Sequence, residues 1–247
     1  MGRNPSDPGR DARHLALEQV GAKGQARIAA GSALLIGAGG IGGAASQYLV
    51  SSGVGRVVIC DFDSVDATNL GRQILYGPED IGKSKVRVAG SRLAAANPDV
   101  EVTIIDSRMD DSQLADAVAD VDVVLDGSDN FSTRFQVNDA CVAASRRLVS
   151  GAAIRLEGQL AVFGPDYKKS PCYRCLYSEA DESLENCAGN GVLAPVPGVI
   201  GTLMAVETLK TLAGIDVGTG VLRLYDGSSS EFHSVAIKKR FDCPTCQ

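Results

Sequence analysis

The sequence predicts an α/β fold: a Rossmann-like, doubly wound, mostly parallel sheet that antiparallel strands extend. Short apolar segments alternate with segments of helical pattern about five times over residues 33–150. This alternation is expected when helices cross between parallel strands. Beyond this region the pattern changes to alternating strand segments at 154–163 and 221–237, which enclose a helical segment at 198–212. We expect these later strands to be antiparallel additions to the same sheet.

The elements of the first half follow one another in a regular order. The expected strands are 33–36, 57–61, 102–105, 122–126 and 148–150, and the expected helices are 41–52, 84–96, 113–119 and 131–144. The strands are short, continuous apolar runs, as is typical of parallel strands buried on both faces. The second helix is expected to stop at Asn97, because the residue before a proline disfavours the helical conformation.

Length and charge limit the class of protein. A chain of 247 residues with 45% hydrophobic content can bury one substantial core. We expect a flexible N-terminal tail at 1–11, which is polar and contains two prolines, and a single domain at 12–247. The net charge of -6 argues against a nucleic-acid binder or a lipid-surface binder, since both need clustered Lys and Arg.

Two uncharged stretches, 32–55 and 186–206, raise the question of membrane insertion. Seven glycines interrupt the first, and four glycines and two prolines interrupt the second. Neither provides the ~20 predominantly apolar residues that a spanning helix needs. The N-terminus has no apolar segment of the kind that a secretory signal requires. We therefore expect a cytoplasmic protein with no membrane partner.

A glycine-rich turn follows the first expected strand. Gly37, Gly39 and Gly42 allow the strand to turn sharply into a helix, so that backbone N–H groups and the helix N-terminus face an anion. Asp61 ends the next strand and could accept a hydrogen bond from a ribose hydroxyl. The alternative is a turn whose glycines only permit close packing of the helix.

A second glycine motif, at 77–84, matches the P-loop pattern G-x-x-x-x-G-K-S letter for letter. Pro78 has no N–H to donate, and Glu79 and Asp80 would repel a phosphate. We therefore expect an ordinary loop that leads into the helix at 84–96.

The cysteines indicate a metal site. Seven cysteines without an export signal are poorly explained as a disulfide framework. Cys172, Cys175, Cys243 and Cys246 form two Cys-x-x-Cys pairs, and four thiolates can surround Zn²⁺ tetrahedrally. Such a zinc would be structural and would tie down the C-terminus, since no ligand position stays open. A redox pair or two accidental clusters are the alternatives.

The other cysteines differ in their surroundings. Cys60 and Cys141 lie within apolar patterns and are expected to be small buried hydrophobes. Cys187 lies in a polar, glycine-bearing segment that we expect to be an exposed loop. Its thiol is either a nucleophile, if the pKa of the thiol is lowered, or inert.

Several motifs in order resemble the ThiF/MoeB/HesA family of ubiquitin-activating-enzyme-like adenylyltransferases. They are Arg10-x-x-Arg13-His14-Leu15, the glycine turn, Asp61-Phe-Asp63, Asn69-Leu-Gly-Arg72-Gln73, Lys83-x-Lys85-Val86, Ser128-Asp129-Asn130 and the four paired cysteines. The resemblance extends from about residue 10 to residue 247. Gly71 departs from it, since the family more often has a larger residue there.

The resemblance implies roles for individual residues. ATP would be held by Gly37, Gly39, Gly40, Gly42, Asp61, Asp63 and Asn69, with Arg72, Gln73 and Lys85 at the phosphates. Asp129 would bind Mg²⁺, and Arg13 would reach the active site of a neighbouring subunit, which implies a homodimer. The plain alternatives are a solvated surface charge for each basic residue and a helix N-cap for Asp129.

The function implied by the resemblance is adenylylation of the C-terminal glycine carboxylate of a small ubiquitin-like sulfur carrier, ThiS-like or MoaD-like and ending in Gly-Gly. The products would be an acyl-adenylate and pyrophosphate, and sulfur would come from a separate donor protein. In a ThiF-type reaction Cys187 would form a sulfur link to the carrier, whereas in a MoeB-type reaction it is dispensable. The pathway, thiamin or molybdenum cofactor biosynthesis or another thioacid route, stays open. Two alternatives from other classes are an NAD(P)-binding oxidoreductase and a noncatalytic zinc-stabilised scaffold.

Overall fold

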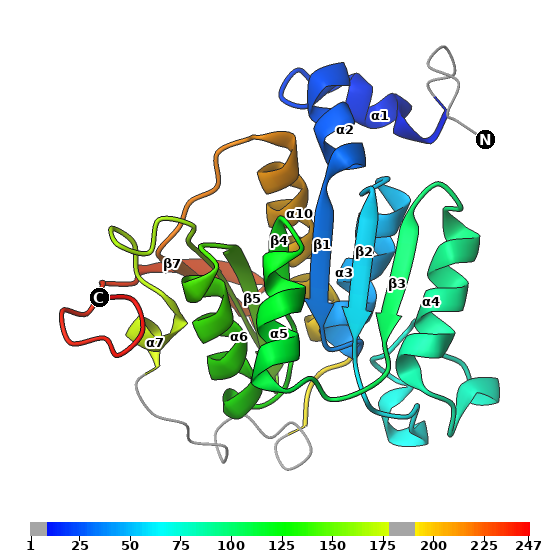
Figure 1. Cartoon of the computed structure of the whole chain (residues 1–247). Coiled ribbons are helices and arrows are strands. Elements are labelled where there is room, and N and C mark those ends of the chain that lie inside the picture. Colours follow the sequence, from blue (N-terminus) through cyan, green and yellow to red (C-terminus); the bar gives the residue numbers. More distant parts are fainter. Residues whose placement is uncertain (1–8, 178–190) are drawn as a thin grey trace.

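The structure is a computed structural model of the chain, and it describes residues 9–177 and 191–247 (Figure 1). Of the expected N-terminal tail, residues 1–8 lie outside the described part. The last three residues of that tail form a short 3-10 helix, η1 (Gly9–Asp11), which leads directly into α1 (Ala12–Leu15).

One eight-stranded sheet runs through the described residues in the order β3-β2-β1-β4-β5-β6-β7-β8. Its strands are β1 (Ser32–Ile36), β2 (Arg56–Cys60), β3 (Glu101–Ile105), β4 (Val123–Asp126), β5 (Arg147–Ile154), β6 (Glu157–Phe163), β7 (Val221–Asp226) and β8 (Glu231–Ala236). Pairs from β3 to β5 are parallel, and pairs from β5 to β8 are antiparallel. This confirms the predicted doubly wound sheet with its antiparallel extension.

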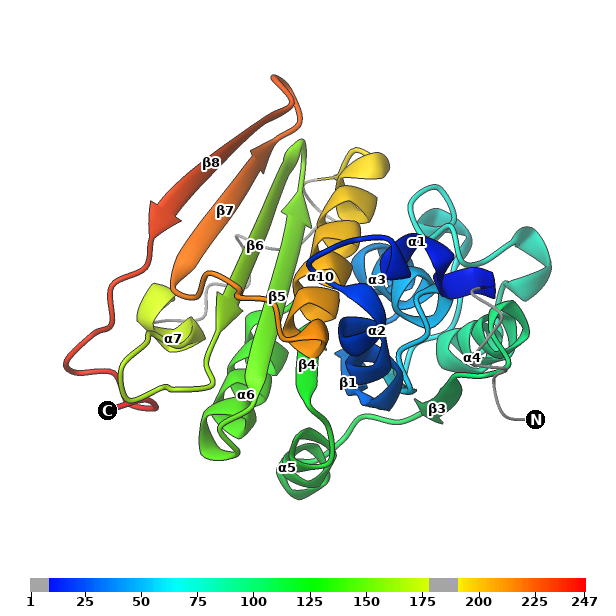
Figure 2. The same ribbon diagram turned by 90° about the horizontal axis from the view of Figure 1, so that it is seen from above.

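Helices cover both faces of the sheet (Figure 2). One face carries α2 (Gly21–Ala30), α3 (Gly40–Ser51), α4 (Lys85–Ala96) and α10 (Pro195–Ala213), and the other carries α5 (Asp111–Ala119), α6 (Phe131–Ala143) and the short α7 (Tyr173–Leu176). Successive residues of β1 alternate between the two cores: Leu34 packs with α5 and α6, and Leu35 packs with α3 and α10. Burial on both faces explains the unbroken apolar runs that the first strands show in the sequence.

Two boundaries of the antiparallel region differ from the prediction. Ile154 belongs to β5 and not to the following strand, because Arg155, with φ +54°, begins a tight turn into β6. Likewise the segment 221–237 is a hairpin of two strands, with Ser230 at φ +61° in the turn. Gly227 and the three serines after it mark the second turn in the sequence, whereas Arg155 does not mark the first, since non-glycine residues rarely adopt positive φ.

The helix α10 begins earlier than expected, at Pro195, because proline is tolerated in the first turn of a helix. It is long and apolar enough to cross a membrane by length and composition, yet half of its apolar stretch is buried inside the fold. A Cβ added at Gly201 would lie 2.1 Å from the carbonyl oxygen of Ile41, so α10 crosses α3 very closely. Its apolar character is accounted for by this core packing.

The P-loop-like segment is a structural loop, as expected. It contains the short helix η3 (Pro78–Asp80) and leads to α4, which Ser84 caps. The Asp80 carboxylate accepts a hydrogen bond from the N–H of Gly77 at 2.9 Å and pairs with Arg92 at 2.7 Å. The acidic residues of the motif therefore hold the loop together.

Candidate active site

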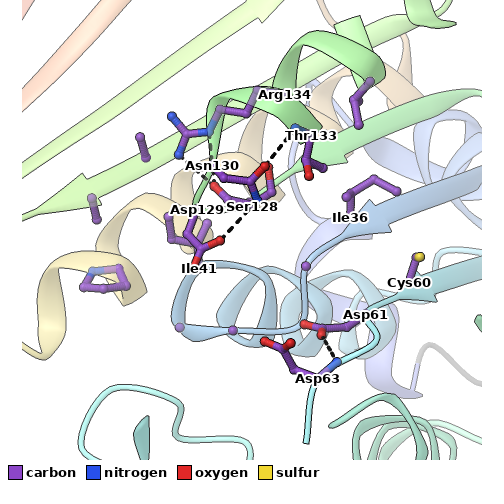
Figure 3. Close-up of a pocket in the computed structure, with 18 of the residues that line it drawn as sticks. Ile36, Ile41, Cys60, Asp61, Asp63, Ser128, Asp129, Asn130, Thr133 and Arg134 are labelled. Atoms are coloured by element: carbon purple, nitrogen blue, oxygen red, sulfur yellow. Dashed lines mark hydrogen bonds between the residues drawn. The ribbon is translucent and has the colours of Figure 1, made fainter. Parts of the chain in front are cut away.

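A pocket of about 380 Å³ lies at the carboxyl ends of β1, β2 and β4 (Figure 3). Open α/β sheets bind ligands at this edge, where neighbouring crossovers leave a crevice. The predicted site residues that line the pocket are Gly37, Gly39, Gly40, Asp61, Asp63, Arg72, Gln73, Lys85 and Asp129. The fold thus brings together residues from five separate motifs of the sequence.

The glycine turn joins β1 to α3, and its glycines have different roles. Gly37 adopts φ +89°, in the left-handed region that glycine tolerates. A Cβ at Gly42 would lie 1.9 Å from the carbonyl oxygen of Gly37, so this position packs against the turn and does not line the pocket. Gly39 and Gly40 face the cavity, at the N-terminal end of α3. The packing alternative therefore applies to Gly42, and an anion site is available beside the other two.

Asp61 ties the glycine turn to the end of β2. Its Oδ2 accepts a hydrogen bond from the N–H of Ala38 at 2.7 Å, and its Oδ1 accepts one from the N–H of Asp63 at 2.8 Å. Burial raises the pKa of Asp61, and the charge of Lys85 and the two hydrogen bonds partly oppose that rise. Asp61 is therefore a structural link within the site, a role that the sequence did not indicate.

The basic residues of the pocket are held by polar partners. Lys85 begins α4 with its side chain only 5% exposed, and its Nζ lies 2.8 Å from Oδ2 of Asp63. Nη2 of Arg72 donates to Oδ1 of Asn69 at 2.6 Å. Asn69 thus does not line the pocket itself but holds a residue that does. A solvated surface charge is the wrong description of Lys85.

Gln73 lines the pocket with a side chain whose hydrogen bonds are only partly made. Its side chain is buried, with 5% of its surface exposed, and lines the pocket beside Gly39. Its Oε1 has no hydrogen-bond partner among the described residues. A buried polar atom without a partner is costly, so the hydrogen bonding of Gln73 is incomplete in this structure.

Asp129 lies in the loop between β4 and α6. The N-cap of α6 is Asn130, whose Oδ1 accepts a hydrogen bond from the N–H of Thr133 at 2.8 Å. The N-cap alternative for Asp129 is therefore wrong. Its carboxylate is exposed in the pocket, and the hydrogen bond that the structure shows to it comes from Nδ2 of Asn130 at 3.4 Å.

The pocket continues beyond the glycine turn along the β5–β6 hairpin. This part is lined by Ala152, Ala153, Ile154, Glu157, Gln159, Tyr177, Val192 and Pro197. The hydroxyl of Tyr177 donates to Oε1 of Gln159 at 2.6 Å. Sequence reasoning missed this half, and it missed Arg134 as well, because the hairpin and α6 contribute single residues without a motif.

The four paired cysteines form a cluster on the other side of α6. Their Sγ atoms all lie within 4.8 Å of one another, with 3.6 Å between Cys172 and Cys243 and 3.5 Å between Cys175 and Cys246. These separations are far from the ~2.05 Å of a disulfide and close to the roughly 3.8 Å between thiolates around a tetrahedral zinc. The cluster therefore fits one zinc ion and argues against a redox pair.

The remaining predicted residues divide into two groups. Cys60 and Cys141 are both buried, as expected, and burial raises the pKa of Cys60 to about 11 and also raises the pKa of Cys141. Arg13 lies on α1, is exposed and does not line the pocket of its own chain. Cys187 lies outside the described residues. The predicted roles of Arg13 and Cys187 stay predictions.

Comparisons with known proteins agree on one family. A sequence profile of the ThiF family matches residues 12–245. The sulfur carrier protein ThiS adenylyltransferase of Escherichia coli (strain K12) is 42% identical over 243 residues, which cover 98% of this chain and 96% of that protein. The adenylyltransferase and sulfurtransferase MOCS3 of Culex quinquefasciatus is 39% identical over 247 residues, covering 98% of this chain but only 56% of that protein.

A solved structure shares the fold. The crystal structure of E. coli MccB with MccA-N7isoASN superimposes with a TM-score of 0.84 at 24% identity, covering 98% of this chain and 76% of that chain. At this level of identity the likeness supports the architecture of the sheet and its helices.

Proposed function

Because this chain belongs to the ThiF family, we propose that it is a nucleotidyltransferase that uses ATP to activate the C-terminal carboxylate of a small sulfur-carrier protein. The relative that matches it over nearly its whole length is a sulfur carrier protein adenylyltransferase. The observation that carries the proposal is the convergence of Arg72, Gln73, Lys85 and Asp129 on one pocket beside the glycine turn.

In the proposed reaction a carboxylate oxygen attacks the α-phosphorus of ATP. The bond from that phosphorus to the bridging oxygen breaks, and pyrophosphate leaves with the electron pair. Because two anions must approach each other, the site has to supply positive charge and hold the reactants in line. Lys85, Arg72 and the N-terminal end of α3 supply that charge within one cavity.

The carboxylates of the pocket have a different task. Asp129 would hold Mg²⁺, because its carboxylate is exposed in the cavity and Mg²⁺ prefers oxygen ligands. When bound, that ion neutralises charge on the phosphates. Asp61 and Asp63 end the second strand on the opposite side of the glycine turn, where a ribose would lie (Figure 3).

The second half of the pocket suits the carrier. Its walls at Ala152 and Ala153 are small, and Gln159 and Tyr177 provide polar atoms on β6 and after α7. An extended tail that ends in Gly-Gly has no side chains at its last two residues and needs such a narrow, polar-edged channel. We propose that this half holds the tail beside the nucleotide, with its carboxylate toward the phosphates.

Three further assignments accompany the proposal. The four-cysteine cluster would hold a structural zinc, since its donor set and spacing fit one. Arg13, exposed and away from its own pocket, would act in the partner subunit of a homodimer. Cys187 would form the sulfur link to the carrier if the reaction proceeds beyond the acyl-adenylate.

The test is exchange of labelled pyrophosphate into ATP, measured with and without a carrier that ends in Gly-Gly. The wild-type protein should catalyse carrier-dependent exchange, and Asp129→Ala should lower it at least about 100-fold. Asp116→Ala, an exposed aspartate on α5, is the matched control and should keep full exchange. Absence of exchange with ThiS-like and MoaD-like carriers, together with tighter binding of NAD than of ATP, would overturn the proposal.

A further inference from the structure

Two buried side chains of opposite charge hold Ser128, the residue immediately before Asp129. Oδ1 of Asp126 accepts hydrogen bonds from the N–H of Ser128 at 3.0 Å and from its hydroxyl at 2.7 Å. On the other side, Nη2 and Nε of Arg134 donate to the carbonyl oxygen of Ser128 at 2.7 and 3.1 Å. The backbone N–H and C=O of this one residue are therefore both fixed (Figure 3).

Both holding residues lie inside the protein. Asp126, the last residue of β4, is 1% exposed, and Arg134, in the first turns of α6, is 4% exposed. Burying a charged group is expensive unless its hydrogen-bonding capacity is used, and an apolar residue of similar size would fill the same space at lower cost. The presence of a charged residue at each of these two positions is thus better explained by the hydrogen bonds to Ser128 than by core packing.

By fixing Ser128, Asp126 and Arg134 set the orientation of the Asp129 side chain. The Asp129 carboxylate is exposed, and the contact that the structure shows to it is the 3.4 Å hydrogen bond from Asn130. This contact comes from the adjacent residue, so it does not tie the carboxylate to any other part of the fold. The direction in which Asp129 points into the pocket is therefore set mainly by the backbone at Ser128.

Arg134 also reaches the four-cysteine cluster. Its Nη1 lies 3.3 Å from the hydroxyl of Tyr173, a residue that is 3% exposed and stands between Cys172 and Cys175. The N–H of Tyr173 donates to Oδ1 of Asn138 on α6 at 2.8 Å, so the start of α7 is fixed to the same helix. A continuous path of hydrogen bonds joins the cysteine cluster to the loop that carries Asp129.

We infer that Arg134 is a positioning residue, which aims the Asp129 carboxylate by holding the Ser128 carbonyl, and that Tyr173 fixes Arg134 from the four-cysteine cluster. The inference rests on the proposed function, because it assigns Arg134 to the use of Mg²⁺ and ATP. The inferred role does not require Arg134 to contact the reactants.

The test measures binding of labelled ATP by equilibrium dialysis over a range of Mg²⁺ concentrations, with no carrier present. Tyr173→Phe removes one hydroxyl and should raise the half-saturating Mg²⁺ concentration about threefold to tenfold, as expected for the loss of one hydrogen bond of ordinary strength. Arg134→Lys should raise it at least about tenfold, since a lysine ammonium cannot reproduce the planar fork of donors.

Tyr167→Phe is the matched control. Tyr167 is also a buried tyrosine near the cysteine cluster, at 5% exposure, and its hydroxyl donates to the carbonyl of Arg146 at 2.7 Å, away from the Asp129 loop. This variant should keep the wild-type Mg²⁺ dependence even if its thermal midpoint falls. Thermal unfolding and zinc content are measured for all three variants, so that a change in the orientation of Asp129 can be told apart from a loss of folding.

The possible outcomes distinguish a failure of this inference from a failure of the proposed function. Wild-type Mg²⁺ dependence in folded Tyr173→Phe and Arg134→Lys would overturn the inference, and so would an equal shift in Tyr167→Phe. If Arg134→Lys does not fold, Tyr173→Phe alone decides. A wild-type protein that binds no ATP at any Mg²⁺ concentration would instead overturn the proposed function and the inference with it.

Discussion

Replacing Gly42 by alanine should disrupt the glycine turn and the stability of the domain together. A Cβ at this position would lie 1.9 Å from the carbonyl oxygen of Gly37, and real Cβ atoms essentially never approach other atoms within 3.0 Å. The two atoms must therefore move apart by about 1.1 Å, and both belong to backbone that cannot rotate away. Since Gly37 adopts a left-handed conformation at the end of β1, the strain falls on the turn itself.

The expected magnitude follows from this overlap. Overpacking a rigid core position costs up to about 3 kcal/mol, occasionally more. For a chain of this size each kcal/mol lowers the thermal midpoint by about 2–4 °C, so Gly42→Ala should lower it by roughly 6–12 °C. ATP binding should be weakened at least about tenfold, because a displaced turn no longer presents its amides to the phosphates.

The adjacent glycine provides the control. A Cβ at Gly43 would have its nearest neighbour, Cβ of Leu75, at 3.6 Å, which is ordinary contact. Because Gly43 lies within α3, Gly43→Ala should stabilise the protein by about 0.5–1 kcal/mol. Differential scanning calorimetry and ATP dialysis on the two variants check the pair. Equal midpoints, or ATP affinity unchanged in Gly42→Ala, would refute the reasoning.

Three other predictions concern separate parts of the molecule. Lys85→Met should lower carrier-dependent pyrophosphate exchange at least about 100-fold. The free energy of unfolding should change by less than about 1 kcal/mol, because the side chain of its partner Asp63 is 55% exposed and becomes solvated when the pair is lost. A variant with full exchange would exclude Lys85 from the reaction. Cys243→Ser should lower the metal content from about one zinc per chain and should lower the thermal midpoint. A chelator added to the wild type should have the same two effects, which elemental analysis and calorimetry measure. A wild type that loses its metal and keeps its stability would contradict this prediction. The hydrogen bond from the N–H of Gly77, and to a lesser extent the charge of Arg92, hold the pKa of Asp80 below its ordinary value. The Asp80 carboxylate therefore stabilises the fold at pH values above its unfolded pKa of about 3.9, and this contribution is lost as the pH falls through the lower folded pKa. Asp80→Asn should therefore lower the thermal midpoint at pH 7, and this difference from the wild type should shrink as the pH falls through the lowered folded pKa. A difference that does not change with pH would show that the charge is not responsible.

The parallel half of the fold could be predicted from the sequence because each of its elements is locally consistent. The strand that ends at Ile36 is apolar on both faces, and the glycines after it mark the turn into α3 and the first residues of that helix. The antiparallel half was less predictable. Its turn at Arg155 uses a positive φ that tertiary contacts impose, since no local preference of arginine favours it.

The candidate site shows the same division. Motifs with several polar residues, such as the segment from Asn69 to Gln73, could be singled out because, taken together and in order, they resemble those of a known family. Arg134 and Tyr173 were not, because nothing sets Arg134 apart from the other polar residues of α6, and the two cysteines beside Tyr173 drew the attention in that segment. Whether Asp129 or Asn130 caps α6 depends on one backbone conformation, which side-chain chemistry alone does not distinguish.

The sequence by itself determined the order of strands and helices, the glycine turn and the four thiolates, since these depend on local pattern and on the chemistry of residue types. Only the tertiary structure decided that Lys85 is buried against Asp63, that Gln73 keeps a buried oxygen without a partner, and that Arg134 joins the Asp129 loop to Tyr173 beside the paired cysteines. Burial, and the pairing that burial demands of a polar group, arise from segments far apart in the chain, so no local pattern contains them.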